Sequence, residues 1–362
     1  MGPCDVFAGP HSLTAKSRLT SVCPTFTTLS VKDTLALNAS YVHIARVVKY
    51  SPINEEPRTN TPGNKERSHM SDSANGVGSA SASLASASSA LASASSAPAS
   101  LATASAFNVS ADGYDRLIGR YLPSLAPAFA EAAGVGEGAD MRVLDVGCGP
   151  GGLTEELSKR VGQHNVAAID PSAPFVQTCR TRLPHADVRQ GYAEELPFDD
   201  NSFDASLASL VIGFFDDAER AATEMLRVTK QGGIIAACFW DFSHMPVLNA
   251  FWSAVTQLDP DAAVETQRLG SRDGEIAALF SRAGAHDVTR GVLQASTEYA
   301  SFDDLWSPIE EGIGPVGQHY LSISEQQRDA VTQNVKEALN LPAGHFTLAA
   351  RAWFACGKVP TL

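Results

Sequence analysis

From about residue 112 onward, short apolar runs alternate with segments whose apolar residues recur every three or four positions. After the first run, Leu153, Leu157 and Val161 fall on one helical stripe, with acidic residues before it and basic residues near its end. The apolar runs predict strands over residues 141–147, 165–170, 186–191, 203–212 and 232–240. Strands and helices in this alternation are typical of a doubly wound α/β fold, a mostly parallel sheet with helices on both faces.

The last third of the chain has a different pattern. Two apolar runs, residues 286–297 and 344–356, predict two further strands, and they bracket helical segments at residues 301–339. Another helical segment lies at about residues 243–260. We expect these helices to form a cap, and we expect residues 112–362 to form one domain.

Residues 1–69 and 70–111 lack this alternation. The second segment contains nearly pure Ala and Ser, with too little large apolar surface to offset chain entropy, so we predict that it is disordered. The Ser, Thr and basic residues of the first segment also occur in transit peptides, but Asp5 and the lack of a clear amphipathic helix weigh against one. We favour a segment that is disordered or not translated, because the codons for residues 65–66 can form a bacterial ribosome-binding sequence shortly before Met70.

The composition of the 362 residues is that of a globular protein, with 44% hydrophobic and 19% charged residues. No run of about 18 apolar residues is present, so we predict no membrane span. The six cysteines are scattered without a CxxC pair, which favours reduced thiols, a cytoplasmic location and no metal site. Residues 1–69 carry a net charge of +3 and the rest of the chain carries −16, and such an acidic surface repels nucleic acid.

A glycine-rich turn directly follows the first predicted strand, in the stretch RVLDVGCGPGGLT. Gly147, Gly149 and Gly152 satisfy GxGxxG, a pattern of turns that allow a ligand to approach the main chain. The pattern alone fits a dinucleotide site, a site for a related ligand, or a tight turn without a ligand. Because the turn joins a strand to a helix, we favour a ligand site.

Acidic residues near the turn help to choose the ligand. Asp145 lies two residues before the first glycine, and Glu155 and Glu156 lie at the start of the following helix. A pyrophosphate is favoured by bare amides at a helix N-terminus, whereas an ammonium or a sulfonium is attracted by fixed negative charge. S-adenosylmethionine carries both of these cations and no phosphate, so the charge pattern favours it over NAD(P).

Four blocks of the sequence resemble class I S-adenosylmethionine-dependent methyltransferases in order and spacing: VLDVGCGPGGLT, AAIDPS, GYAEELPFDDNSFD and LRVTKQGGIIAACFW. The most similar branch includes the ubiquinone and menaquinone C-methyltransferases. The resemblance covers about residues 113–240 and implies a seven-stranded sheet whose last strand is antiparallel. It also implies S-adenosylmethionine as the methyl donor and a small molecule as the acceptor.

The resemblance implies a set of cofactor-binding residues. Asp145, Gly147, Cys148 and Gly149 would form the loop around the methionine part of the cofactor. Asp170, at the end of the second predicted strand, would accept hydrogen bonds from the ribose hydroxyls. A dinucleotide fold places a ribose acid at a similar spacing, so Asp170 does not separate the two cofactors. A helix N-cap is the other interpretation of Asp170.

Further positions are implied around the adenine and the transferred methyl group. Ala193 and Glu194 match positions near the adenine, and Ser209 would lie near the methyl group. Tyr114 matches a tyrosine that covers the cofactor, with plain packing as the alternative.

The catalytic base is where this chain departs from the family. Many relatives carry a histidine just after the fourth strand, but residues 211–214 are Val-Ile-Gly-Phe here. His244, with Asp241 nearby, is our candidate for a base, and His319 is a second one. The missing histidine leaves a non-catalytic S-adenosylmethionine-binding protein open, and an NAD(P)-dependent oxidoreductase also stays open, although the sequence has no Tyr-x-x-x-Lys pair.

Overall fold

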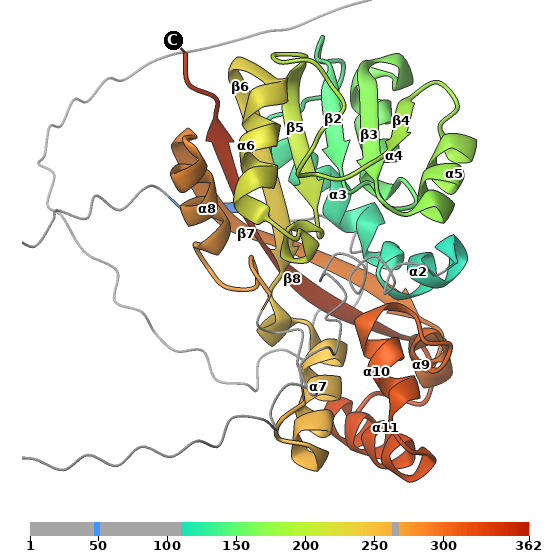
Figure 1. Cartoon of the computed structure of the whole chain (residues 1–362). Helices are drawn as coiled ribbons and strands as arrows, with labels where there is room; N and C mark the ends of the chain where they lie inside the picture. The colour runs from blue at the N-terminus through green and yellow to red at the C-terminus, as the bar shows by residue number, and fades with distance from the viewer. Residues whose placement is uncertain (1–46, 51–109, 263–267, 362) are drawn as a thin grey trace, which may run out of the picture. The chain divides into compact units, whose positions relative to one another are not determined.

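A computed structural model of the chain describes residues 47–50, 110–262 and 268–361. Its sheet has the strand order β1-β7-β8-β6-β5-β2-β3-β4 (Figure 1). The strands are β1 (Val47–Tyr50), β2 (Val143–Val146), β3 (Val166–Asp170), β4 (Asp187–Gln190), β5 (Phe203–Ser209), β6 (Thr229–Trp240), β7 (His286–Tyr299) and β8 (Phe346–Lys358).

Seven of these strands, β2 to β8, confirm the predicted fold class. The strands β4, β3, β2, β5 and β6 pair in parallel, and β8 lies antiparallel between β6 and β7. The short strand β1 adds an edge strand, antiparallel to β7. It lies within residues 1–69, which we predicted to be disordered or not translated. Residues 1–46 and 51–109 lie outside the described residues, and so do the predictions made for them.

The helices are α2 (Ala111–Leu117), α3 (Leu122–Ala132), α4 (Gly152–Val161), α5 (Ala173–Arg182), α6 (Ala218–Val228), α7 (Pro246–Leu258), α8 (Glu275–Ala283), α9 (Phe302–Glu310), α10 (Gly314–Ser322) and α11 (Glu325–Leu339). Figure 1 shows α6 in front of the sheet and α3 behind it, and α3 packs on α4 while α6 packs on α8. Leu153, Leu157 and Val161 of α4 are all buried, as the helical stripe predicted. None of the helices in the described ranges is long and apolar enough to cross a membrane.

The central strands are buried on both faces. Every residue of β2 and β3 is buried, because helices cover the sheet from both sides. This explains why their sequences are continuous apolar runs. Asp145 and Asp170 are the two acidic residues within these two strands.

The helices of the cap gather at one end of the sheet (Figure 1). Helix α7 packs on α11, and α9 packs on both α10 and α2. At their centre Trp306 lies against the rings of Phe251 and Tyr320, at 6.3 and 5.6 Å between centroids. The segment from α9 to α11 leaves the sheet at Tyr299 and returns at Phe346, and these two residues pair across β7 and β8 with stacked rings.

Strand β5 ends earlier than predicted. We expected it to continue to residue 212, but it ends at Ser209. The reason is Leu210, whose φ of +60° is in the left-handed region that L residues with side chains rarely adopt. The Leu210 amide still donates a hydrogen bond to the Cys238 carbonyl of β6 (2.9 Å), and the chain then turns away from the sheet.

Candidate functional site

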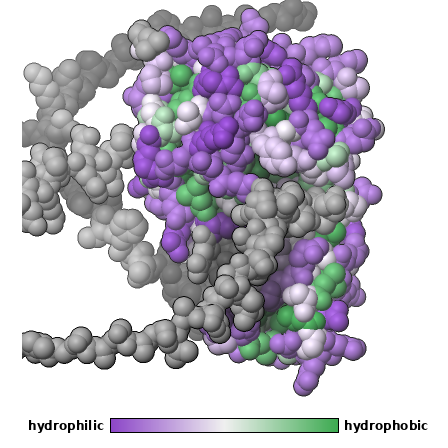
Figure 2. Space-filling model, in the orientation of Figure 1, coloured by the Kyte–Doolittle hydropathy of each residue, from purple (hydrophilic) through white to green (hydrophobic). Residues whose placement is uncertain are grey.

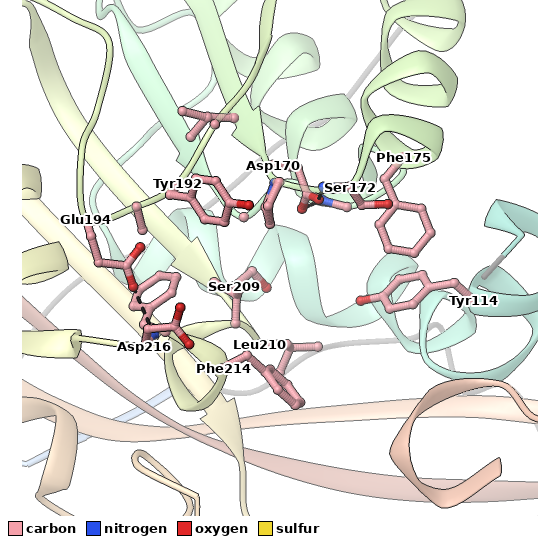
Figure 3. Close-up of a pocket in the computed structure, with 18 residues that line it drawn as sticks. Tyr114, Asp170, Ser172, Phe175, Tyr192, Glu194, Ser209, Leu210, Phe214 and Asp216 are labelled. Atoms are coloured by element: carbon pink, nitrogen blue, oxygen red, sulfur yellow. Dashed lines mark hydrogen bonds between the residues drawn. The ribbon is translucent and has the colours of Figure 1, made fainter. Parts of the chain in front are cut away.

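A cleft lies at the carboxyl ends of β2, β3 and β5 (Figure 3), where doubly wound sheets bind their ligands. It encloses about 850 Å³ of empty space, part of it open to solvent. Seven residues singled out from the sequence line this cleft: Tyr114, Gly147, Gly149, Asp170, Ala193, Glu194 and Ser209.

The glycine loop forms the floor of the cleft. Gly147 and Gly149 have φ angles of +74° and +54°, which glycine adopts without strain. A Cβ atom on Gly147 would lie 2.6 Å from Val211, so packing excludes a side chain there. A Cβ atom on Gly149 would have only Tyr114 within reach, at 4.0 Å, and would project into the space under that ring. The absence of a side chain at Gly149 therefore keeps a cradle open between the loop and Tyr114.

Asp170 joins the loop to the end of β3. The Gly149 amide donates a hydrogen bond to Asp170 Oδ2 (2.9 Å), and the Ser172 amide donates one to Oδ1 (2.8 Å). Ser172, not Asp170, is the N-cap residue of α5, so the N-cap interpretation of Asp170 is wrong. Burial raises the pKa of Asp170 to about 6. The carboxylate lines the cleft and is ionised at neutral pH.

Asp145 lies beneath the loop and not in the cleft. Its side chain is 0% exposed, and Thr154 Oγ1 of α4 donates a hydrogen bond to Asp145 Oδ2 (2.6 Å). A side chain without accessible surface cannot touch a ligand in the cleft, so the predicted contact of this carboxylate with the ligand needs correction. Glu155 and Glu156 form ion pairs along α4 with Lys159 and Arg160. The three acids on which we based the choice of ligand therefore support the loop and its helix.

Other acids supply the negative charge of the cleft. Asp170, Glu194 and Asp216 line it, and none of the described lining residues is Lys, Arg or His. Glu194 Oε1 accepts hydrogen bonds from the amides of Asp216 and Asp217 (2.9 and 3.3 Å), which fixes the loop before α6. The cleft therefore favours a cationic ligand over a diphosphate.

Cys148 is buried beside a second thiol. Its hydrogen bond to Cys179, together with burial, raises the pKa of the Cys148 thiol. A thiol with a raised pKa is a poor nucleophile. Cys148 is buried and is not among the residues that line the cleft, so its side chain belongs to a small core cluster with Ala168, Val176 and Cys179.

Aromatic residues form the walls of the cleft, and the sequence alone did not single out most of them. The rings of Tyr114 and Phe175 lie 5.3 Å apart and face the cleft from α2 and α5 (Figure 3). Tyr192 also lines the cleft, although 53% of it is exposed, and Phe214 lines the side opposite Asp170. Tyr192 directly precedes Ala193 and Glu194, so its place in that block was a usable signal. Burial also raises the pKa of the Tyr114 hydroxyl, which is therefore protonated at neutral pH.

The predicted base does not lie in this cleft. His244 lines a separate cavity with Ser124, Gln294 and Arg351. Its Nδ1 lies 3.0 Å from Asp241 Oδ2, and its side chain is mostly exposed. The prediction of His244 as the base is therefore wrong for this geometry, because its ring lines a different cavity.

The second candidate, His319, is part of the cap packing. Its ring lies 5.2 Å from the ring of Trp252, and burial lowers its pKa.

The part of the chain that forms the cleft is similar in sequence to known proteins. Residues 144–237 match a family model described as a methyltransferase domain. The chain is 37% identical over 123 residues to demethylmenaquinone methyltransferase of Renibacterium salmoninarum, which covers 34% of this chain and 50% of that relative. It is 27% identical over 220 residues to an uncharacterized protein of Mycobacterium tuberculosis, which covers 57% of this chain and 78% of that relative. The chain thus spans half the length of the first of these relatives.

Solved structures resemble this chain at low identity. The YcgJ protein of Bacillus subtilis has 21% sequence identity and a TM-score of 0.42, over 66% of this chain and 98% of that chain.

The buried carboxyl of Asp145 has a consequence for stability. Burial raises its pKa to about 7, well above its value in an unfolded chain. Between about pH 4 and pH 7 the folded state therefore holds a proton that the unfolded state releases, so the unfolding free energy falls as the pH rises through this window. Asp145→Asn should reduce this fall by up to about 1.4 kcal/mol per pH unit. Urea titrations of the unmodified chain and of Asp145→Asn at several pH values measure the unfolding free energy. Equal slopes of this free energy against pH would contradict the raised pKa of Asp145.

Proposed function

The chain carries a class I S-adenosylmethionine-dependent methyltransferase domain, and from this premise we propose that it transfers the methyl group of S-adenosylmethionine to a small-molecule acceptor. When bound, this cofactor supplies an electrophilic methyl group on a positively charged sulfur. One observation carries the proposal: a cleft at the glycine loop that is lined by acids and by no basic side chain among the described residues.

The residues of the cleft fit the parts of the cofactor. Asp170 already accepts two amide hydrogen bonds, and each carboxylate oxygen keeps a further lone pair for a ribose hydroxyl. The open cradle at Gly149 suits the amino-acid part, with Tyr114 above it. We assign Tyr192, Ala193 and Glu194 to the adenine end of the cleft.

Ser209 is assigned to the methyl end, because it lies at the carboxyl end of β5 and lines the cleft between Glu194 on one side and Tyr114 on the other (Figure 3). Its hydroxyl lies 3.6 Å from Cys238 Sγ. We propose that it orients the acceptor, since a serine without an adjacent base is a poor proton acceptor. Orientation is the main requirement of an in-line methyl transfer, and good orientation contributes about 7–11 kcal/mol to lowering such barriers.

Two other functions are less well supported. An NAD(P)-dependent oxidoreductase would place a diphosphate beside Asp170 and Glu194 with no basic lining residue in the described chain to neutralise it. No histidine is among the described residues that line the cleft, which would suit a non-catalytic binding protein. Methyl transfer to an acceptor that keeps its proton, or loses it unaided, needs no base, however. The buried cysteines Cys148, Cys179 and Cys238 form no disulfide with one another, which supports the proposed cytoplasmic setting.

The ribose assignment predicts a pH-dependent affinity. The ionised Asp170 accepts hydroxyl hydrogen bonds better than the protonated form, and its pKa in the free protein is about 6. We expect the Kd for S-adenosylmethionine to rise as the pH falls from 7 to 5, at most tenfold per pH unit. Asp170→Asn should bind about 10–100-fold more weakly at pH 7, the loss of one charged hydrogen bond. The affinity of the Asp170→Asn variant should vary little between pH 5 and 7 in calorimetric titrations. If this variant binds S-adenosylmethionine at pH 7 as tightly as the unmodified chain does, Asp170 does not hold the ribose.

The cradle predicts a second effect, with a matched control. Gly149→Ala places a methyl group under Tyr114, and Gly138→Ala introduces a side chain at a similar positive φ (+69°) with nothing within 4 Å and outside the cleft. Both substitutions should lower the unfolding free energy by about 1–2 kcal/mol, the cost of the left-handed conformation. Only Gly149→Ala should raise the Kd for S-adenosylhomocysteine, by tenfold or more. Equal binding by the two variants would refute the cradle.

A further inference from the structure

A second cavity adjoins the proposed cofactor cleft. It has about 520 Å³ of empty space, counting the part that is open to solvent. Tyr114, Leu210 and Phe214 line both spaces, so these three side chains form the boundary between them. In Figure 3, Leu210 and Phe214 lie next to each other below Ser209, and the Tyr114 hydroxyl points toward the middle of the cleft. The second cavity is thus placed where an acceptor can reach the methyl end.

The walls of this cavity are apolar. They come from α2 and its C-cap residue Ile118, from β6 and from two cap helices, with Trp240, Leu248 and Val316 as examples. None of the described residues that line it carries a carboxylate, an amine, a guanidinium or an imidazole, and the Tyr114 hydroxyl and the Trp240 indole N–H are the polar side-chain groups there. A charged group brought into such a space loses its hydration without gaining a partner, which costs several kcal/mol. The cavity therefore selects against charge.

The part of the described surface that Figure 2 shows over α5 and α6 does not offer a comparable environment. In Figure 2, the face over α5 and α6 is mostly hydrophilic, with small and separated hydrophobic spots. Large exposed hydrophobic side chains on the described surface include Tyr192, Leu258 and Leu321, which come from three different elements or loops. The cavity therefore offers an apolar molecule a more continuous apolar wall than this face does.

The strained backbone of Leu210 indicates that the boundary between the two spaces has a functional role. It is one of four non-glycine residues with positive φ in the described chain, and it lines both spaces. A leucine in this conformation costs about 1–3 kcal/mol, and such strain persists chiefly at functional sites. The left-handed turn ends β5 and directs the Leu210 side chain to the boundary, so the strain places an apolar wall between cofactor and acceptor spaces.

We propose that the methyl acceptor is an uncharged, mainly aromatic or hydrocarbon molecule that binds in this second cavity with its nucleophilic atom toward Tyr114 and Leu210. The inference rests on the proposed function. In the transfer, a lone pair of the acceptor forms the bond to the methyl carbon while the carbon–sulfur bond breaks. Its electron pair stays on sulfur, which becomes uncharged, and the positive charge passes to the methylated acceptor. An acceptor with an N–H or O–H then releases that proton to water.

Three probes of the same ring size test the selection by charge. They are 2-naphthol, which is uncharged at pH 7, the anion 2-naphthoate and the cation 2-naphthylmethylammonium. Each is titrated calorimetrically into the full chain saturated with S-adenosylhomocysteine, whose own binding is measured first. We expect 2-naphthol to bind at least tenfold more tightly than either ion. If S-adenosylhomocysteine does not bind, the proposed function and the inference both fail, whereas equal binding of the three probes overturns the inference alone.

A pair of variants locates the probe. Ile118 lines the second cavity but not the cofactor cleft, and it is partly exposed, so a polar substitution is compatible with folding. Ile118→Glu should weaken 2-naphthol binding at least tenfold and strengthen binding of the cation, while the matched variant Ile118→Gln should show a smaller loss and no gain for the cation. Both should bind S-adenosylhomocysteine within twofold of the unmodified chain. Unchanged probe binding in Ile118→Glu would place the probe elsewhere and overturn the proposal.

Discussion

The carboxylate of Asp170 holds together the part of the fold on which the site depends. Parallel strands end at the same edge of the sheet, but the loops that leave them have no secondary structure to fix them relative to one another. By accepting hydrogen bonds from Gly149 and Ser172, Asp170 connects the end of β3 to the loop after β2 and to the start of α5. The cleft is thereby formed by the chain itself, and a ligand does not have to order it on binding.

The two acids of the central strands have separate tasks. Asp145 is completely buried and binds Thr154, so it fixes α4 against β2 from below the loop, and Asp170 faces the cleft. The acidic character that we expected of the site is present, but Asp170, Glu194 and Asp216 provide it. A carboxylate in the interior also accounts for the raised pKa of Asp145, because burial disfavours its charged form.

Much of the fold could be predicted from the sequence because periodicity follows burial directly. The continuous apolar runs of β2 and β3 and the stripe of α4 are such cases. The end of β5 could not be predicted, because the φ of Leu210 is set by tertiary packing and leucine has no local signal for it. The side-chain direction of Asp145 and the placement of His244 in a different cavity also depend on packing, so sequence position did not determine either.

The pairing of Tyr299 with Phe346 makes the segment from α9 to α11 an insertion at the end of the β7–β8 hairpin. The 46 intervening positions begin and end at adjacent points of one hairpin, and below that point the two strands keep one register as far as the pair of Thr289 and Cys356. An insertion anchored in this way can change in length and sequence while β7 and β8 keep their register. Since α10 supplies part of the wall of the apolar cavity, exchange of this segment between related chains would, under the proposed function, change the acceptor while the donor half of the molecule is retained.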